Sequence, residues 1–149
     1  RLVQIDAPEA QEDECYGSEA SAELASLLPP GARVRLVADP RLDRVDDYGR
    51  LLRHVYRGEK NLNVVLVRRG AATVWLYGGD RGVYAKQLLR VAREAKAAGR
   101  GLWGACPGTP FDPAHGANTG SRGGSPGTGG TGACPGAAAT RAPAARRAG

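Results

Sequence analysis

Two short segments carry residue types that could together cleave a phosphodiester bond. Arg1 and the run DAPE at residues 6–9 make up the first segment, and the run DYGR at residues 47–50 is the second. Asp6 and Glu9 are hard oxygen donors, which suit Ca²⁺ or Mg²⁺ better than zinc. Arginine side chains are planar forks that match phosphate oxygens. A cation and two arginines could stabilise charge on a phosphate while a carboxylate activates water.

Each segment also has a simpler interpretation. Asp and Pro are ordinary turn formers, so the run at residues 6–9 could do no more than end a strand. Arg50 could be a surface side chain with a partner across a strand, and exposed ion pairs contribute little to stability. His54, in the middle of an expected strand, is interpreted as structural. The chemistry therefore depends on whether the fold brings the two segments together.

Composition and charge divide the chain into two parts. From residue 107 onward there is no Val, Ile or Leu, and Gly, Ala, Pro, Ser and Thr dominate. Such a segment buries too little apolar surface to fold, so we expect a folded domain over residues 1–106 and a disordered tail over 107–149. The net charge of +6 suits a polyanionic partner such as nucleic acid. No apolar run is long enough to span a membrane, which takes roughly 18 residues or more.

Helices and short strands alternate within residues 1–106. Residues 39–49 are charged and turn-forming, which predicts an exposed loop, and residues 57–60 predict a hairpin turn. This mixture is typical of an α+β fold, closer to a small barrel with packed helices than to a βαβ sheet, although four strands are few for a closed barrel. The expected strands are 2–5, 33–37, 51–57 and 72–77, and the expected helices are 18–28, 61–69 and 83–98.

Five blocks, in this order, resemble the staphylococcal-nuclease-like (thermonuclease) family: RLVQIDAPE, CYGSEASAELASLL, DDYGRLLRHVY, NLNVVLVRRGAATV and AREAKAAGRGLWG. The resemblance covers about residues 1–106. It implies a fold that is mainly β, an OB-type five-stranded barrel with three helices. It also implies a Ca²⁺-dependent nuclease that hydrolyses the phosphodiester bonds of single- or double-stranded DNA and RNA and leaves 3′-phosphates.

The resemblance also implies a role for individual residues. Arg1 and Arg50 match two arginines that clamp the phosphate, and Glu9 matches a glutamate that acts as general base or orients water. Asp6 matches a carboxylate ligand of Ca²⁺. Ala7 would ligate the same ion through its backbone carbonyl.

Two tyrosines match substrate-binding positions of the family. Tyr48 would donate a hydrogen bond to a nucleotide phosphate. Tyr77 would contact the nucleotide ring, although Trp75 and Leu76 make its register ambiguous.

The family has a second calcium aspartate and further strands upstream of the position of Arg1. We therefore expect this chain to be an N-terminally truncated form whose first strands are missing. That expectation leaves open an alternative function, a non-catalytic OB-type module that binds nucleic acid, or an inactive fragment. The enzyme is favoured because a binding module has no need of Asp6 and Glu9 as a buried pair of carboxylates that repels phosphate.

The sequence contains three cysteines, Cys15, Cys106 and Cys134. The resemblance to extracytoplasmic relatives implies a disulfide between Cys15 and Cys106, and hence a secreted or extracytoplasmic, oxidising location. Two ordinary thiols are the alternative, because sequence alone does not set connectivity. Cys134 would stay free or pair between molecules. We expect the protein to act as a monomer.

Overall fold

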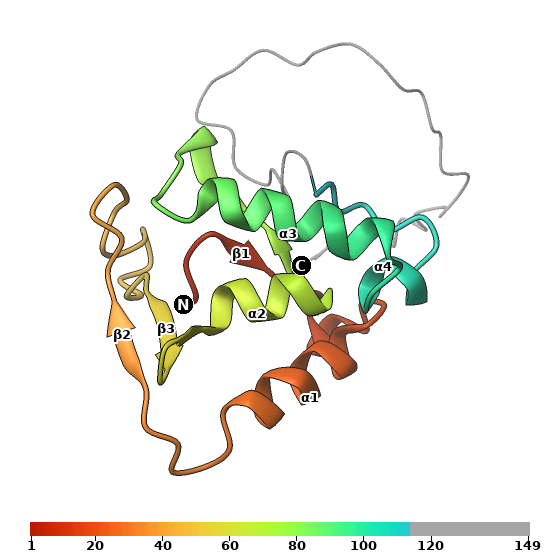
Figure 1. The fold of residues 1–149 in the computed structure, drawn as a ribbon, viewed down its shortest axis with the longest axis horizontal. Helices are drawn as coiled ribbons and strands as arrows, with labels where there is room; N and C mark the ends of the chain where they lie inside the picture. The colour runs from red at the N-terminus through yellow and green to blue at the C-terminus, as the bar shows by residue number, and fades with distance from the viewer. Residues whose placement is uncertain (114–149) are drawn as a thin grey trace, which may run out of the picture.

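Short strands and helices alternate along the chain in the computed structural model, which describes residues 1–113 (Figure 1). This is the mixed α+β class that the sequence predicts. The strands are β1 (Ile5–Asp6), β2 (Arg35–Val37), β3 (His54–Arg57), β4 (Lys60–Asn61) and β5 (Thr73–Val74). The helices are α1 (Gly17–Leu27), α2 (Leu62–Arg69), α3 (Ala85–Ala97) and α4 (Leu102–Ala105), with 3₁₀ turns η1 (Ala10–Glu12) and η2 (Tyr77–Gly79).

Capping residues determine where α2 begins and ends, and apolar spacing determines α3. The side chain of Asn61 caps α2 by accepting hydrogen bonds from two backbone N–H groups, and Gly70 ends it with a φ of 73°. The apolar positions of α3 recur at helical spacing, and α3 packs along α2 (Figure 1). Together with β5 these helices enclose the core, in which Val67, Val74 and Leu88 are fully buried.

The N-terminal segment lies between two parts of the chain that are distant in sequence. On one side β1 pairs antiparallel with β5, with Ile5 opposite Val74. On the other side Leu2 forms a parallel bridge with Arg53, next to the start of β3. The opening strand therefore has a partner along both edges.

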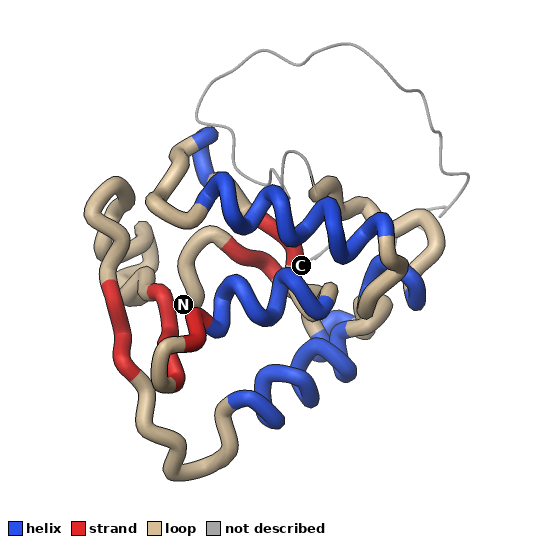
Figure 2. Tube along the Cα trace, in the orientation of Figure 1, coloured by secondary structure: helices blue, strands red, loops and turns tan. Residues whose placement is uncertain are grey.

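The strands form two small sheets, which do not confirm the expected five-stranded barrel. β1 and β5 make one sheet, and β2, β3 and β4 make an antiparallel sheet of three; no closed barrel is present among residues 1–113. The strands are short compared with the helices (Figure 2). The expected strand at 2–5 is interrupted because Gln4 has a φ of 61°, a value that extended backbone does not adopt.

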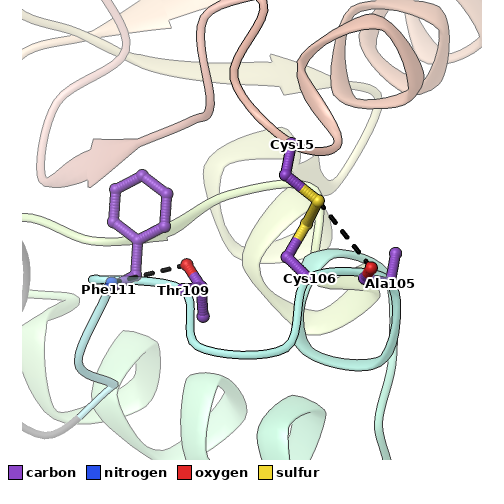
Figure 3. Close-up of a disulfide and its surroundings, with 5 residues drawn as sticks. All are labelled: Cys15, Ala105, Cys106, Thr109 and Phe111. Carbon is purple, nitrogen blue, oxygen red and sulfur yellow. Dashed lines mark hydrogen bonds between the residues drawn. A yellow bond between two sulfur atoms is a disulfide. The ribbon is translucent and has the colours of Figure 1, made fainter.

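The end of the described chain folds back onto the start of α1. Cys15 and Cys106 are placed as a disulfide, with their Cα atoms 5.9 Å apart (Figure 3). Beyond the expected boundary at residue 106 the chain continues with Pro113 buried. The rest of the predicted tail, with Cys134, lies outside the described residues. No helix among residues 1–113 is both long enough and apolar enough to cross a membrane.

Candidate active site

A cleft of about 620 Å³ gathers the polar side chains that the sequence singled out. One wall is the loop before β3, and the other follows β5. The cleft also contains the end of β1, so three segments that are far apart in sequence meet here. Its lining includes Arg1, Asp6, Glu9, Tyr48, Arg50 and Tyr77.

Four of these side chains also border a second hollow of about 420 Å³, which lies against α1. They are Arg1, Asp6, Glu9 and Arg50. Ala7 lines this second hollow beside Asp6. The two arginines and two carboxylates therefore line both hollows.

Backbone pairing with residues 51–53 places Arg1. Its carbonyl oxygen accepts a hydrogen bond from the N–H of Arg53 at 3.0 Å, and its backbone nitrogen donates to Leu51 at 2.8 Å. The guanidinium lies 3.3 Å from Asp6 Oδ1 and 4.4 Å from the centre of the Trp75 ring. Arg1 thus rests between a carboxylate and an aromatic face.

A tight turn organised by Asp46 places Arg50. Asp46 Oδ1 accepts the backbone N–H groups of Tyr48 and Arg50 at 3.0 and 2.8 Å, and Oδ2 accepts Arg50 Nε at 2.6 Å. Gly49 takes a φ of 78°, which lets the turn close. The Arg50 guanidinium also lies 5.1 Å from the centre of the Tyr48 ring. Its partner is in the same turn rather than across a strand.

The two carboxylates differ in their surroundings. Asp6 is half-buried, whereas Glu9 is exposed, so the expectation of a buried pair is wrong for Glu9. Burial raises the pKa of Asp6, Arg1 opposes this, and the nearby charges of Glu9 and Glu14 raise the pKa further. Asp6 therefore lies in a place where more positive charge would be stabilising.

Glu9 is held by a compact loop that leads into α1. Its N–H donates to Glu14 Oε2 at 2.7 Å, and its carbonyl accepts the N–H of Glu14 at 3.2 Å. Gly17 packs so closely that a Cβ there would lie 2.7 Å from the backbone nitrogen of Ala10. Cys15 lies within this loop, so its disulfide with Cys106 anchors the loop to α4 (Figure 3).

A cation beside Asp6 would have few protein ligands. Among residues 1–113 no three His, Cys, Asp or Glu side chains group closely enough to hold a metal ion. The Asp6 carboxylate and the Ala7 carbonyl would supply two oxygens, and Ca²⁺ takes six to eight, so water and phosphate would supply the others.

Two residues of the cleft were missed as site residues. Trp75 lines the cleft and makes an edge-on contact with Tyr77, with ring centres 5.6 Å apart. No alternation in β5 reveals it, because Thr73 and Val74 are both fully buried. Asp46 was part of the recognised motif, but its hold on Arg50 depends on a turn that only the structure shows.

Comparisons with known proteins identify the family of this chain. Residues 1–105 match the family model described as staphylococcal nuclease homologue. An uncharacterized endonuclease of Escherichia coli O157:H7 is 38% identical over 104 residues, covering 69% of this chain and 61% of that protein. In Bacillus subtilis, the SPbeta prophage-derived endonuclease YokF is 33% identical and endonuclease YncB is 32% identical, each over 107 residues and 69% of this chain.

The chain spans only part of these relatives, 36% of the length of YokF and 50% of that of YncB. The matched region nevertheless includes every residue of the cleft described above. The chain belongs to the staphylococcal nuclease homologue family.

Proposed function

We propose that this chain hydrolyses phosphodiester bonds of DNA and RNA at the cluster formed by Arg1, Asp6, Glu9 and Arg50, with Ca²⁺ as cofactor. One observation carries the proposal. Two arginines from distant segments line the same two hollows as two carboxylates. The family, whose similar members are named endonucleases, adds support at the level of reaction class.

The arrangement suggests how the chemistry is divided among the side chains. A phosphate entering the cleft would bind the guanidinium nitrogens that Asp6 and Asp46 leave open on the two arginines. Arg1 and Arg50 would then stabilise the negative charge that grows on the phosphate oxygens as the bond breaks. Glu9, exposed at the cleft, would orient a water molecule and accept its proton.

Asp6 and the carbonyl of Ala7 would hold the cofactor beside this cluster. Bound there, Ca²⁺ would supply Lewis-acid polarisation of the phosphate.

The walls of the cleft suit a flexible nucleic-acid strand. Tyr48 is 84% exposed and Tyr77 is 41% exposed, so both present aromatic surface to solvent. Together with Trp75 they could stack on bases. Stacking tolerates any nucleic-acid sequence, because every base has a flat face. We propose single-stranded DNA and RNA as the substrates that fit most readily.

Cleavage of a fluorophore–quencher oligonucleotide in the presence of Ca²⁺ tests the proposal. Arg50→Ala should lower kcat/KM by roughly 100-fold or more, the scale seen when one transition-state charge partner is removed. Arg90→Ala is the matched control, because Arg90 is an exposed arginine on α3 that pairs only with Glu94 among the contacts described. Equal rates for Arg50→Ala and the parent would refute the assignment and point to a contaminating nuclease.

A non-catalytic module that binds nucleic acid is the second candidate. The lack of a three-residue metal-ligating group within residues 1–113 favours it. It predicts that the protein binds a labelled oligonucleotide without cleaving it at any Ca²⁺ concentration.

The disulfide suits an oxidising, extracytoplasmic compartment, which we propose as the location of the protein. We also propose that the protein acts as a monomer, which size-exclusion chromatography with light scattering would test.

A further inference from the structure

Asp39 is a buried carboxylate that the proposed chemistry does not use. The sequence predicted an exposed loop from Asp39 onward, but this residue is only 3% exposed. Its Oδ1 accepts the N–H of Arg41 at 3.0 Å, and its Oδ2 accepts the N–H of Val83 at 2.9 Å. A carboxylate is rarely buried unless it is paired, so these bonds indicate a specific role.

His54 is the third partner of this carboxylate. Its Nε2 lies 3.1 Å from Asp39 Oδ2, and the residue is 1% exposed. An ionised carboxylate only accepts hydrogen bonds, so Nε2 must carry the proton. Nδ1 has no hydrogen-bond partner among the described residues, and the ring packs edge-on against Tyr84 with centres 4.7 Å apart.

These bonds join the two walls of the cleft. The segment that starts at Asp39 continues into the wall with Asp46 and Arg50, while Val83 follows the opposite wall at residues 75–80. A Cβ at Gly82 would overlap Asp39 Oδ2, so the second wall approaches the carboxylate closely. One side chain thus connects the start of one wall, the strand β3 and the end of the other wall.

We propose that the Asp39–His54 pair is a positioning clamp that sets the separation of the two walls and so the placement of Arg50 opposite Arg1. The inference rests on the proposed function for its catalytic consequence, but the clamp itself is a property of the fold. Neither residue lines the cleft, so both act through the segments that they hold. A displacement of about 1 Å at a reacting centre can cost roughly 100-fold in rate.

The clamp also responds to pH. Burial lowers the pKa of His54, and Asp39 opposes this. Burial raises the pKa of Asp39, but hydrogen bonds from Arg41, His54 and Val83 outweigh it and leave that pKa below its ordinary value.

The other groups near the His54 ring are phenols. Tyr84 touches the ring, its hydroxyl contacts that of Tyr56, and the Arg35 guanidinium lies 4.6 Å from the centre of the Tyr56 ring. The imidazole of His54 is the group at the centre of the clamp whose protonation acidification favours. Opening the walls exposes His54 to water and returns its pKa toward the ordinary value of about 6.5, so opening should become easier as the pH falls below that value.

Three variants of the full chain separate positioning from stability. His54→Leu removes the hydrogen bond, and His54→Gln keeps a donor that does not titrate. Val67→Ala is the control, because Val67 is fully buried in α2 and its truncation lowers stability without touching the clamp. Hydrogen exchange of residues 40–53 and 77–84 is measured with kcat and KM on an oligonucleotide, at a temperature where circular dichroism shows each variant folded.

We expect His54→Leu to accelerate exchange in both walls and to lower kcat at least about 10-fold, with His54→Gln close to the parent. If His54→Leu behaves as Val67→Ala does, or loosens only one wall, the clamp is refuted. If His54→Leu does not fold, the test compares the parent with His54→Gln. Both walls should loosen between pH 7.5 and pH 5.5 in the parent but not in His54→Gln. Equal responses to pH in the two proteins would overturn the proposal. If hydrogen exchange changes as expected but the parent cleaves no oligonucleotide, the proposed function is refuted and the clamp is not.

Discussion

The Cys15–Cys106 disulfide should supply a large share of the stability of this domain. The two cysteines are 91 residues apart in sequence. In the chain-entropy model, closing a loop of that length removes enough freedom from the unfolded state to stabilise the folded state by about 4.6 kcal/mol at 25 °C. Whole domains are stable by only about 5–15 kcal/mol, so removing this bond should bring the protein close to unfolding.

Urea denaturation followed by tryptophan fluorescence measures this effect. Cys134→Ala serves as the reference, since it removes the one further thiol in the sequence. The triple variant, which also carries Cys15→Ala and Cys106→Ala, should unfold at a midpoint about 2 M lower if the slope is about 2 kcal/mol/M. Reducing the reference protein with dithiothreitol should give the same shift.

Two outcomes would refute different parts of the reasoning. If the two proteins unfold at the same urea concentration, the loop-closure estimate is wrong for this fold. If Cys15 and Cys106 are both alkylated in the unreduced, folded protein, the pairing itself is wrong.

Four more outcomes test the site and the fold. Glu9→Gln should lower kcat by orders of magnitude while oligonucleotide binding by anisotropy persists, because its role is confined to the reaction; cleavage at the parental rate contradicts that role. EGTA should abolish cleavage and added Ca²⁺ restore it, whereas activity in chelator would rule out the proposed cofactor. Trp75→Ala should weaken oligonucleotide binding by roughly 10-fold or more through lost stacking, and unchanged anisotropy titrations would argue against it. Burial lowers the pKa of His54 in the folded protein despite Asp39, so below a pH of about 6.5 the unfolded state binds more protons than the folded state. The free energy of unfolding should therefore fall from pH 7.5 to pH 5.5. A urea midpoint that stays constant over this range would contradict the prediction.

The helices were predictable because their signals lie close together in the chain. A cap at Asn61 and a glycine at residue 70 bound α2, and the apolar spacing of α3 is clear. The short α4 was missed because one turn of helix has too few positions to show a period. The expected strands were too long, since no residue pattern announces that Gln4 adopts a positive φ.

Pairing and burial over long sequence distances could not be predicted. β1 pairs with β5 far along the chain, and nothing near Ile5 indicates Val74 as its partner. Asp39 looked exposed because its neighbours in sequence are charged; its partners His54 and Val83 are 15 and 44 residues away. The residue types of the site were visible in the motifs, whereas their meeting in one cleft is a product of those distant contacts.

The two arginines of the cleft already have anionic partners, Asp6 for Arg1 and Asp46 for Arg50. Each pair engages one guanidinium nitrogen, so a bound phosphate would compete with the carboxylate for the arginine, and a carboxylate that loses part of this attraction would attract a cation from solution. This uptake offsets part of the counterion release that normally makes nucleic-acid binding sensitive to salt. The affinity of the cleft for a nucleic-acid strand should therefore decline less steeply with ionic strength than expected for two arginines that have no carboxylate partners.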